Sequence, residues 1–192
     1  MRLFVSLDLP EEVRRLSASW GREVARASAG ARAVRAGNTH ITLAFLGDRS
    51  PAEIPPIADA MRSSVSGGFT LSLGAPVRLP RRRPRALAFE VHDQSGGLAA
   101  LQAGLAEALT GAIGWKAERS FRPHLTAVRF GRSHRGDVLE LPVTPAITFT
   151  AESISLVQSR RNPEGAEYEF LETVDLQTPA SKSHSETDIS PT

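Results

Sequence analysis

One short pattern occurs twice in this chain: a histidine followed two residues later by a threonine, inside a run of strand-forming residues. The first copy places His40 and Thr42 in the stretch HITLAFLG, and the second places His124 and Thr126 in the stretch HLTAVRF. Because successive side chains of a strand point to opposite faces, each histidine shares a face with its threonine. Phe45 has the opposite parity and is expected on the other face. The pattern therefore predicts two strands that present matching His-Thr faces.

The rest of the sequence places strands and helices around each copy of the pattern. Residues 1–7 alternate like a strand, and helices are expected at residues 10–29, 50–64 and 95–111 from start signals or leucine spacing. Further strands are expected at residues 69–73, 86–91, 123–130, 147–159 and 168–175, with a proline- and arginine-rich connection over 76–85 and a turn over 160–165. Strand, helix and motif strand recur in each half, which indicates an α+β fold with two similar lobes.

The composition fits a globular domain followed by a polar tail. Hydrophobic residues make up 41% of the 192 residues, whereas residues 177–192 are rich in serine, threonine and proline. We expect a domain over residues 1–176 and a disordered tail over residues 177–192. The absence of cysteine excludes disulfides, thiolate metal sites and a cysteine nucleophile. Because no run reaches the roughly 20 apolar residues that span a bilayer, and no signal-peptide segment is visible, we expect a cytoplasmic protein without membrane contact. We also expect a monomer.

The paired histidines suggest acid-base chemistry. A lone histidine at a strand end usually makes a structural hydrogen bond, but two copies 84 residues apart (124 minus 40) place one in each half. Histidine titrates near neutral pH, so two imidazoles across a cleft can give one proton and take another, as chemistry on a phosphate requires. The abundant arginines agree with a polyanionic ligand, since a guanidinium binds phosphate as a fork, but also with a GC-rich coding sequence.

Several segments in order along the chain carry a family resemblance. MRLFVSLDLP, NTHITLAFLG, PRALAFEV, FRPHLTAVRF and LVQSRRNPEGAEYE, spread over about residues 1–176, resemble the two-histidine phosphoesterase superfamily, specifically the bacterial RNA 2',3'-cyclic phosphodiesterases also called 2'-5' RNA ligases. The chain departs from the family pattern at Ala33, Ala36 and Ala127. The resemblance implies two antiparallel sheets with helices on their outer faces around a central cleft. It also implies an RNA substrate with a 2',3'-cyclic phosphate end and no metal or other cofactor.

The same resemblance implies roles for the four motif residues. His40 would protonate the departing 3' oxygen and His124 would deprotonate the attacking water, which leaves a 2'-phosphate; the sequence alone does not orient the two histidines. Thr42 and Thr126 would donate hydrogen bonds to the non-bridging phosphate oxygens. Both threonines are also common strand residues, so their pattern alone does not require this role.

Arginines near the motifs are further candidates. Arg122 shares the face of His124 if the strand extends past the intervening proline, and it is a candidate substrate-binding residue. Arg129 matches a family arginine, but its parity places it away from the cleft unless the strand bulges. The arginines of residues 81–85 fit either an RNA contact or a solvated loop. The remaining histidines, expected at the surface, are His92, His134 and His184.

Three activities are compatible with these patterns. The first is hydrolysis of RNA 2',3'-cyclic phosphate ends to 2'-phosphomonoesters. The second is the reverse direction, which joins such an end to a 5'-hydroxyl in a 2'-5' linkage and uses the same acid and base. The third is a catalytically silent RNA-binding module. Intact pairs of histidines and threonines favour an enzyme, because binding alone does not require both.

Overall fold

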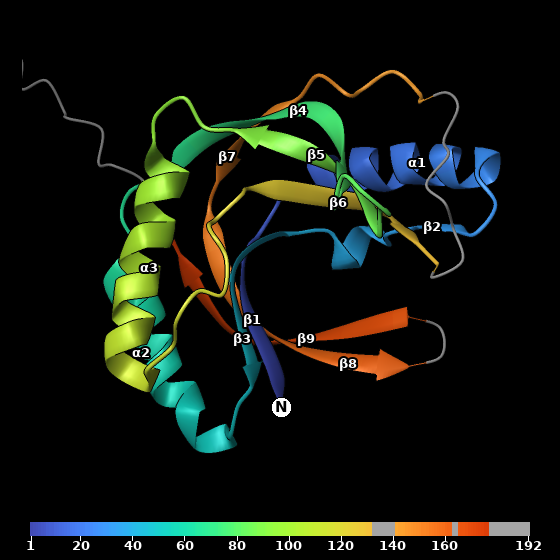
Figure 1. The fold of residues 1–192 in the computed structure, drawn as a ribbon. Helices are drawn as coiled ribbons and strands as arrows, with labels where there is room; N and C mark the ends of the chain where they lie inside the picture. Colours follow the sequence, from blue (N-terminus) through green and yellow to red (C-terminus); the bar gives the residue numbers. More distant parts are fainter. Residues whose placement is uncertain (132–140, 163–164, 177–192) are drawn as a thin grey trace, which may run out of the picture.

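The computed structural model describes residues 1–131, 141–162 and 165–176 (Figure 1). The predicted disordered tail over residues 177–192, and with it His184, lies outside these residues, as does His134. The elements in chain order are β1 (Arg2–Leu7), α1 (Glu11–Ala27), β2 (Ala31–Ala33), η1 (Ala36–Asn38), β3 (Ile41–Asp48), η2 (Pro51–Glu53), α2 (Ile54–Ser64), β4 (Phe69–Leu79), β5 (Ala86–His92), α3 (Gly97–Ile113), β6 (His124–Phe130), β7 (Thr148–Ala151), β8 (Ser153–Asn162) and β9 (Gly165–Asp175).

The strands form a curled antiparallel sheet in the order β7-β4-β5-β6-β3-β1-β8-β9, with β2 also beside β6 (Figure 1). This arrangement confirms the predicted α+β class. Two groups of four strands, β7-β4-β5-β6 and β3-β1-β8-β9, are joined where β6 meets β3. A single register pair, Ile41 opposite Leu125, links these two strands. The two sheets expected from the sequence are therefore continuous, and both motif strands lie at their junction.

Helices pack on the outside of the curl (Figure 1). Helix α1 packs against β2 and β6, while α2 and α3 pack against each other and contact β9 and β3 respectively. Trp20 of α1 is buried against Phe89 of β5, with ring centroids 4.6 Å apart. Gly21 lets the helix approach β6 closely, since a Cβ there would lie 2.5 Å from the Ala127 carbonyl oxygen. These contacts hold the backbone of β6, the second motif strand, on the face of the sheet that packs against α1.

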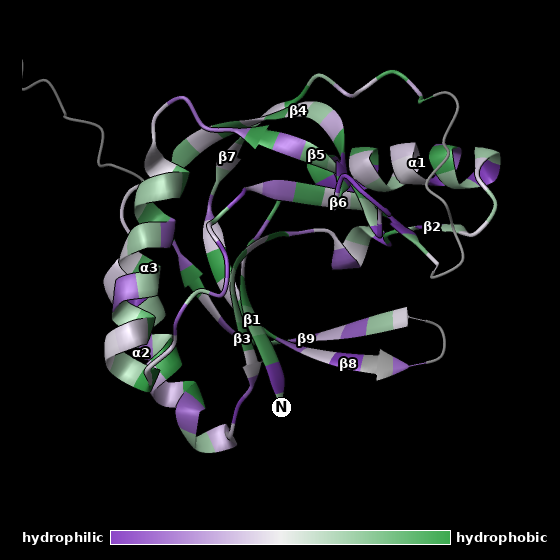
Figure 2. Ribbon diagram, in the orientation of Figure 1, coloured by the Kyte–Doolittle hydropathy of each residue, from purple (hydrophilic) through white to green (hydrophobic). Residues whose placement is uncertain are grey.

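Hydropathy along the chain follows this arrangement. Strand β1, near the centre of the sheet, is mostly hydrophobic and all but its first residue are buried (Figure 2). The β8–β9 hairpin at the edge carries more polar residues, and β9 is largely exposed. Because the removal of apolar surface from water drives folding, the apolar strand β1 is buried and the more polar hairpin lies at the edge of the sheet.

Some strand boundaries differ from the sequence-based prediction. Strand β4 continues to Leu79 through Pro76, which the prediction assigned to a loop; Pro76 is tolerated because it lies at a register irregularity against β5. The single strand predicted over residues 147–159 is two strands, β7 beside β4 and β8 beside β1. Strands β8 and β9 also extend into the predicted turn over 160–165. An unbroken alternating pattern does not reveal a change of neighbouring strand.

Candidate active site

The four motif side chains surround one backbone pair. Ile41 of β3 lies opposite Leu125 of β6, and both side chains are fully buried at 0% exposure. Side chains alternate along a strand, so the residues before and after this pair, which are the motif histidines and threonines, face the other way. All four line one cleft: His40, Thr42, His124 and Thr126. The structure therefore brings together every residue of the predicted constellation.

Strand β3 has a bulge immediately after the first motif. In the pairing of β1 with β3, Ser6 lies opposite Thr42 and Val5 lies opposite Ala44, so Leu43 is an extra residue in β3. An extra residue reverses the alternation beyond it. Phe45 is consequently on the same face as Thr42, lines the cleft and is 64% exposed. The prediction that Phe45 points away from the cleft is wrong, because parity assumes a regular strand.

A bulge at the equivalent point of β6 has the same effect. Thr126 lies opposite Ala88 and Arg129 lies opposite Ala86, so Ala127 is the extra residue. Ala86 and Ala88 share a face of β5, and Thr126 and Arg129 must do the same. The expectation that Arg129 points away from the cleft is wrong. It assumed a regular strand, and β6 has the bulge that was named as the exception. Arg129 lines the cleft and is exposed.

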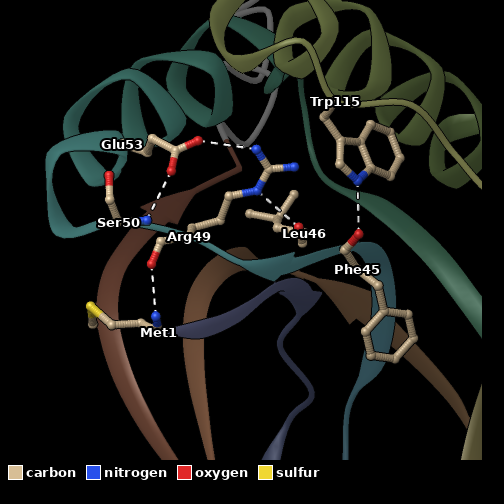
Figure 3. Close-up of polar contacts among 7 residues, drawn as sticks. All are labelled: Met1, Phe45, Leu46, Arg49, Ser50, Glu53 and Trp115. Atoms are coloured by element: carbon tan, nitrogen blue, oxygen red, sulfur yellow. Dashed lines mark hydrogen bonds and ion pairs between the residues drawn. The ribbon is translucent and has the colours of Figure 1, made fainter.

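Two side chains donate hydrogen bonds to carbonyl groups at the irregular end of β3. A second register shift makes Leu46 another extra residue. The indole Nε1 of Trp115 donates to the carbonyl oxygen of Phe45 at 2.7 Å, and the Nε of Arg49 donates to that of Leu46 at 2.9 Å (Figure 3). Arg49 is itself held by Glu53 at 3.0 Å. These bonds stabilise the backbone that orients the ring of Phe45, which extends away from Trp115 in Figure 3.

Hydrogen bonds orient both histidine rings in the same way. The Nδ1 of His40 lies 2.9 Å from the carbonyl oxygen of Asn38, and the Nδ1 of His124 lies 2.8 Å from that of Arg122. A carbonyl can only accept, so each Nδ1 carries a proton and donates it. The Nε2 of each ring is then the atom that gains or loses a proton. In His40 this atom lies 3.1 Å from the hydroxyl of Thr42.

The environment of His40 disfavours its charged form. Burial lowers the pKa of His40 to about 4; the hydrogen bond with the Asn38 carbonyl opposes this effect, while the charges of Arg129 and His124 add to it. The rings of Phe4 and Tyr168 lie against the imidazole, with centroids 4.8 and 5.4 Å away, and cover part of it. In the free protein His40 is therefore neutral at pH 7.

The cleft around these residues has a volume of about 1650 Å³ and a strongly basic lining. The carboxylates in its lining are those of Asp48 and Glu118. The basic side chains that line it are Arg2, Arg32, Arg35, Arg49, Arg81, Arg85, Lys116, Arg119, Arg122 and Arg129. A surface of this kind attracts an anion and raises its local concentration. Of the predicted arginine loop, Arg81 and Arg85 line the cleft, whereas Arg82 and Arg83 are exposed outside the lining.

Two other residues named from the sequence are Arg122, which lines the cleft, and His92, which does not. Arg122 precedes β6, and its guanidinium lies 3.3 Å from the carboxylate of Glu90. Its backbone carbonyl accepts the hydrogen bond from His124. His92 is exposed and does not line the cleft, as predicted.

The sequence reasoning missed the aromatic residues beside His40. Phe4 contacts both Phe45 and Tyr168, with centroids 6.0 and 5.2 Å away. Sequence position gives no sign of this cluster, because its members come from three strands. The registers of β1 with β3, of β1 with β8 and of β8 with β9 together assemble it.

Within residues 1–131, 141–162 and 165–176, no group of three or more histidine, cysteine, aspartate or glutamate side chains is arranged to hold a metal ion. In the same part of the chain, no helix combines the length and apolar character needed to cross a bilayer.

This chain is similar to known proteins in both sequence and fold. Residues 8–163 match the sequence model of the 2'-5' RNA ligase superfamily. A Thermus thermophilus protein named RNA 2',3'-cyclic phosphodiesterase is 30% identical over 186 residues, which cover 92% of this chain and 90% of that protein. The crystal structure of TT0787 from Thermus thermophilus superposes with a TM-score of 0.80 at 26% identity, covering 93% of this chain and 100% of the other. Escherichia coli LigT in complex with 3'-AMP superposes with a TM-score of 0.76 at 26% identity, covering 91% and 97%.

Proposed function

Because this chain belongs to the 2'-5' RNA ligase superfamily, we propose that it hydrolyses RNA ends bearing a 2',3'-cyclic phosphate to 2'-phosphomonoesters. The observation that carries the proposal is the cluster of two histidines and two threonines around the Ile41–Leu125 pair. This cluster supplies two proton-transfer groups and two hydroxyl donors to one small volume. The relative named RNA 2',3'-cyclic phosphodiesterase supports the same activity.

The reaction needs one base and one acid. Water attacks phosphorus as the base removes its proton, a new P–O bond forms, and the bond to the 3' oxygen breaks as the acid protonates that oxygen. In-line displacement places the attacking and leaving oxygens on opposite sides of phosphorus. We assign the base to the Nε2 of His124 and the acid to the Nε2 of His40. Each Nδ1 is held by a backbone carbonyl, which leaves Nε2 for the transfer.

The acid role requires His40 to be protonated in the complex, although its low pKa makes it neutral in the free protein. The cyclic phosphate is an anion. Bound beside His40, it opposes the positive charges of Arg129 and His124 and raises the pKa of His40. Substrate binding and proton uptake by His40 are then coupled. If His40 were the base and His124 the acid, His40 would act in the neutral form that it already has in the free protein.

The surrounding residues supply binding and charge stabilisation. The hydroxyls of Thr42 and Thr126 donate to the non-bridging oxygens, where negative charge builds up during the reaction. Arg129, exposed on the same face as Thr126, pairs with the phosphate charge. Phe45, with its exposed ring in the cleft, provides an apolar surface for the terminal base.

The activity is tested with purified protein and EDTA on an RNA ending in a 2',3'-cyclic phosphate. Products are identified by mass spectrometry and by sensitivity to phosphatase. The wild type and the matched control His92→Ala should form the 2'-phosphate, whereas His40→Ala and His124→Ala should lose about two to four orders of magnitude in rate. Activity abolished by EDTA, or retained in both motif variants, contradicts the mechanism. Accumulation of a 2'-5' linked product instead of the monoester indicates ligation.

The two histidine roles are separated with a substrate whose 3' oxygen is replaced by sulfur. A thiolate leaves without protonation, so a variant that lacks the acid regains activity on this substrate. We expect His40→Ala to recover most of the wild-type rate and His124→Ala to remain inactive. Recovery by His124→Ala alone would mean that His124 is the acid and His40 is the base.

A further inference from the structure

Two arginines face each other across neighbouring strands at one end of the cleft. Arg32 is the middle residue of the short strand β2 and lies directly opposite Arg129 of β6. Residues opposite each other in an antiparallel pair point to the same face, with Cβ atoms about 5 Å apart. Both side chains are exposed and both line the cleft. The two arginine side chains thus leave the sheet side by side on one face.

This pair is costly for the free protein. Like charges directly opposite each other in a sheet destabilise it. Other arginines of the structure are matched with carboxylates, as in Arg49 with Glu53 and Arg160 with Glu169. Across residues 1–131, 141–162 and 165–176, no carboxylate forms an ion pair or hydrogen bond with Arg32 or Arg129. An anion that lies between them would remove the repulsion.

Arg129 lies near the motif histidines, and Arg32 lies farther from them. Arg129 is near enough to His40 to lower its pKa. Strands β3 and β2 lie along the same edge of β6, β3 at Leu125 and β2 from Val128 to Phe130, while β5 occupies the other edge. Arg32 therefore lies farther along the edge on which His40 lies. An anion at Arg32 is a neighbour of the group held by the histidines, but a different one.

We propose that Arg32 binds the phosphodiester that precedes the terminal nucleotide, beside Arg129, which faces the cyclic phosphate at the histidines. The proposal rests on the proposed function, since an RNA end with its cyclic phosphate between the histidines has its next phosphate one nucleotide upstream. Each guanidinium can grip phosphate oxygens through paired N–H donors. The consequence is a preference for an RNA chain over a cyclic mononucleotide, set by contact with the backbone and independent of base identity.

The test compares three substrates: a nucleoside 2',3'-cyclic phosphate, a dinucleotide with the same cyclic phosphate end, and that dinucleotide with a neutral methylphosphonate linkage. For the wild type, kcat/KM should be at least about tenfold higher on the charged dinucleotide than on the other two, the effect of one charge-assisted contact. Arg32→Gln should lower the ratio of charged dinucleotide to mononucleotide by about the same factor. It should change the ratio of neutral dinucleotide to mononucleotide little.

Arg22→Gln is the matched control, because Arg22 is exposed on α1 outside the cleft and its loss removes the same charge from the protein. Its ratios should equal those of the wild type. An unchanged ratio in Arg32→Gln, or the same fall with the neutral linkage, overturns the subsite. If the wild type hydrolyses none of the substrates, the proposed function fails. Circular dichroism melting checks the fold of Arg32→Gln, which should be no less stable than the wild type because a like-charge contact is removed.

Discussion

Phe45 and Arg129 occupy equivalent positions in the two motif strands, each three residues beyond the motif threonine and each turned into the cleft by a bulge. The two motifs match in their histidines and threonines, but these two positions differ in chemistry. One offers an exposed aromatic ring and the other a guanidinium. The symmetric cluster of motif histidines and threonines is thereby flanked by an apolar side and a cationic side. A nucleotide, with a flat base and a charged backbone, has the same asymmetry.

Removing either motif hydroxyl should slow the reaction without disturbing the fold. Thr42→Val and Thr126→Val keep the shape of the side chain and delete one donor to the phosphate. We expect kcat/KM to fall about a hundredfold for each variant, because such donors act most strongly on the charge of the transition state. Steady-state kinetics measures the loss. Thr70→Val, on the exposed face of β4, is the control and should behave like the wild type; equal activity in all three variants contradicts the assigned role.

Phe45→Ala should weaken substrate binding but have little effect on the free energy of unfolding. The Phe45 ring is 64% exposed, so its truncation should lower the free energy of unfolding by less than about 1 kcal/mol. Phe89→Ala removes a ring with 0% exposure and should cost about 3–5 kcal/mol. If Phe45 contacts the terminal base, KM should rise several-fold in Phe45→Ala. Urea unfolding and kinetics test both parts, and an unchanged KM removes Phe45 from the substrate site.

The low pKa of His40 makes stability depend on pH. The pKa of this group is about 4 in the folded protein, against an ordinary value of 6.5. Between these values the unfolded chain binds more protons, so the folded state is penalised as pH falls below 6.5 and the penalty is absent above it. His40→Gln cannot titrate. Relative to this variant, the wild type should lose about 2 kcal/mol of unfolding free energy between pH 8 and pH 5. Urea titrations at the two pH values provide the comparison, and an equal change in both proteins contradicts the lowered pKa.

Trp115→Phe should loosen the end of β3. The substitution keeps an aromatic ring but removes the Nε1–H that bonds the Phe45 carbonyl at 2.7 Å. Trp115 is 7% exposed, so little water can reach the Phe45 carbonyl to replace the lost hydrogen bond. We expect the unfolding free energy to fall by about 1–3 kcal/mol. The kcat/KM of this variant should fall with it, because the same backbone orients Phe45. A stable variant with normal kinetics would mean that the bond is dispensable.

The sequence predicted the elements that depend on local periodicity. Alternation is a property of a few neighbouring residues, so the two motif strands and the shared face of His40 and Thr42 could be predicted without knowing their partners. Phe45 and Arg129 could not, because a bulge is defined by the register with another strand. The pairing of Arg32 with Arg129 needed β2, three residues long and too short to carry a periodic pattern. The aromatic cluster at Phe4 likewise depends on strands that are distant in sequence.

The Ile41–Leu125 pair has a consequence for how this chain tolerates change in length. Each of these residues is the immediate neighbour of a motif histidine, and together they are the main-chain contact between β3 and β6. The spacing of the two imidazoles is therefore set by adjacent backbone, whatever the length of the chain that connects the two strands. Insertions or deletions in the connecting segments can therefore leave the spacing of the two histidines unchanged.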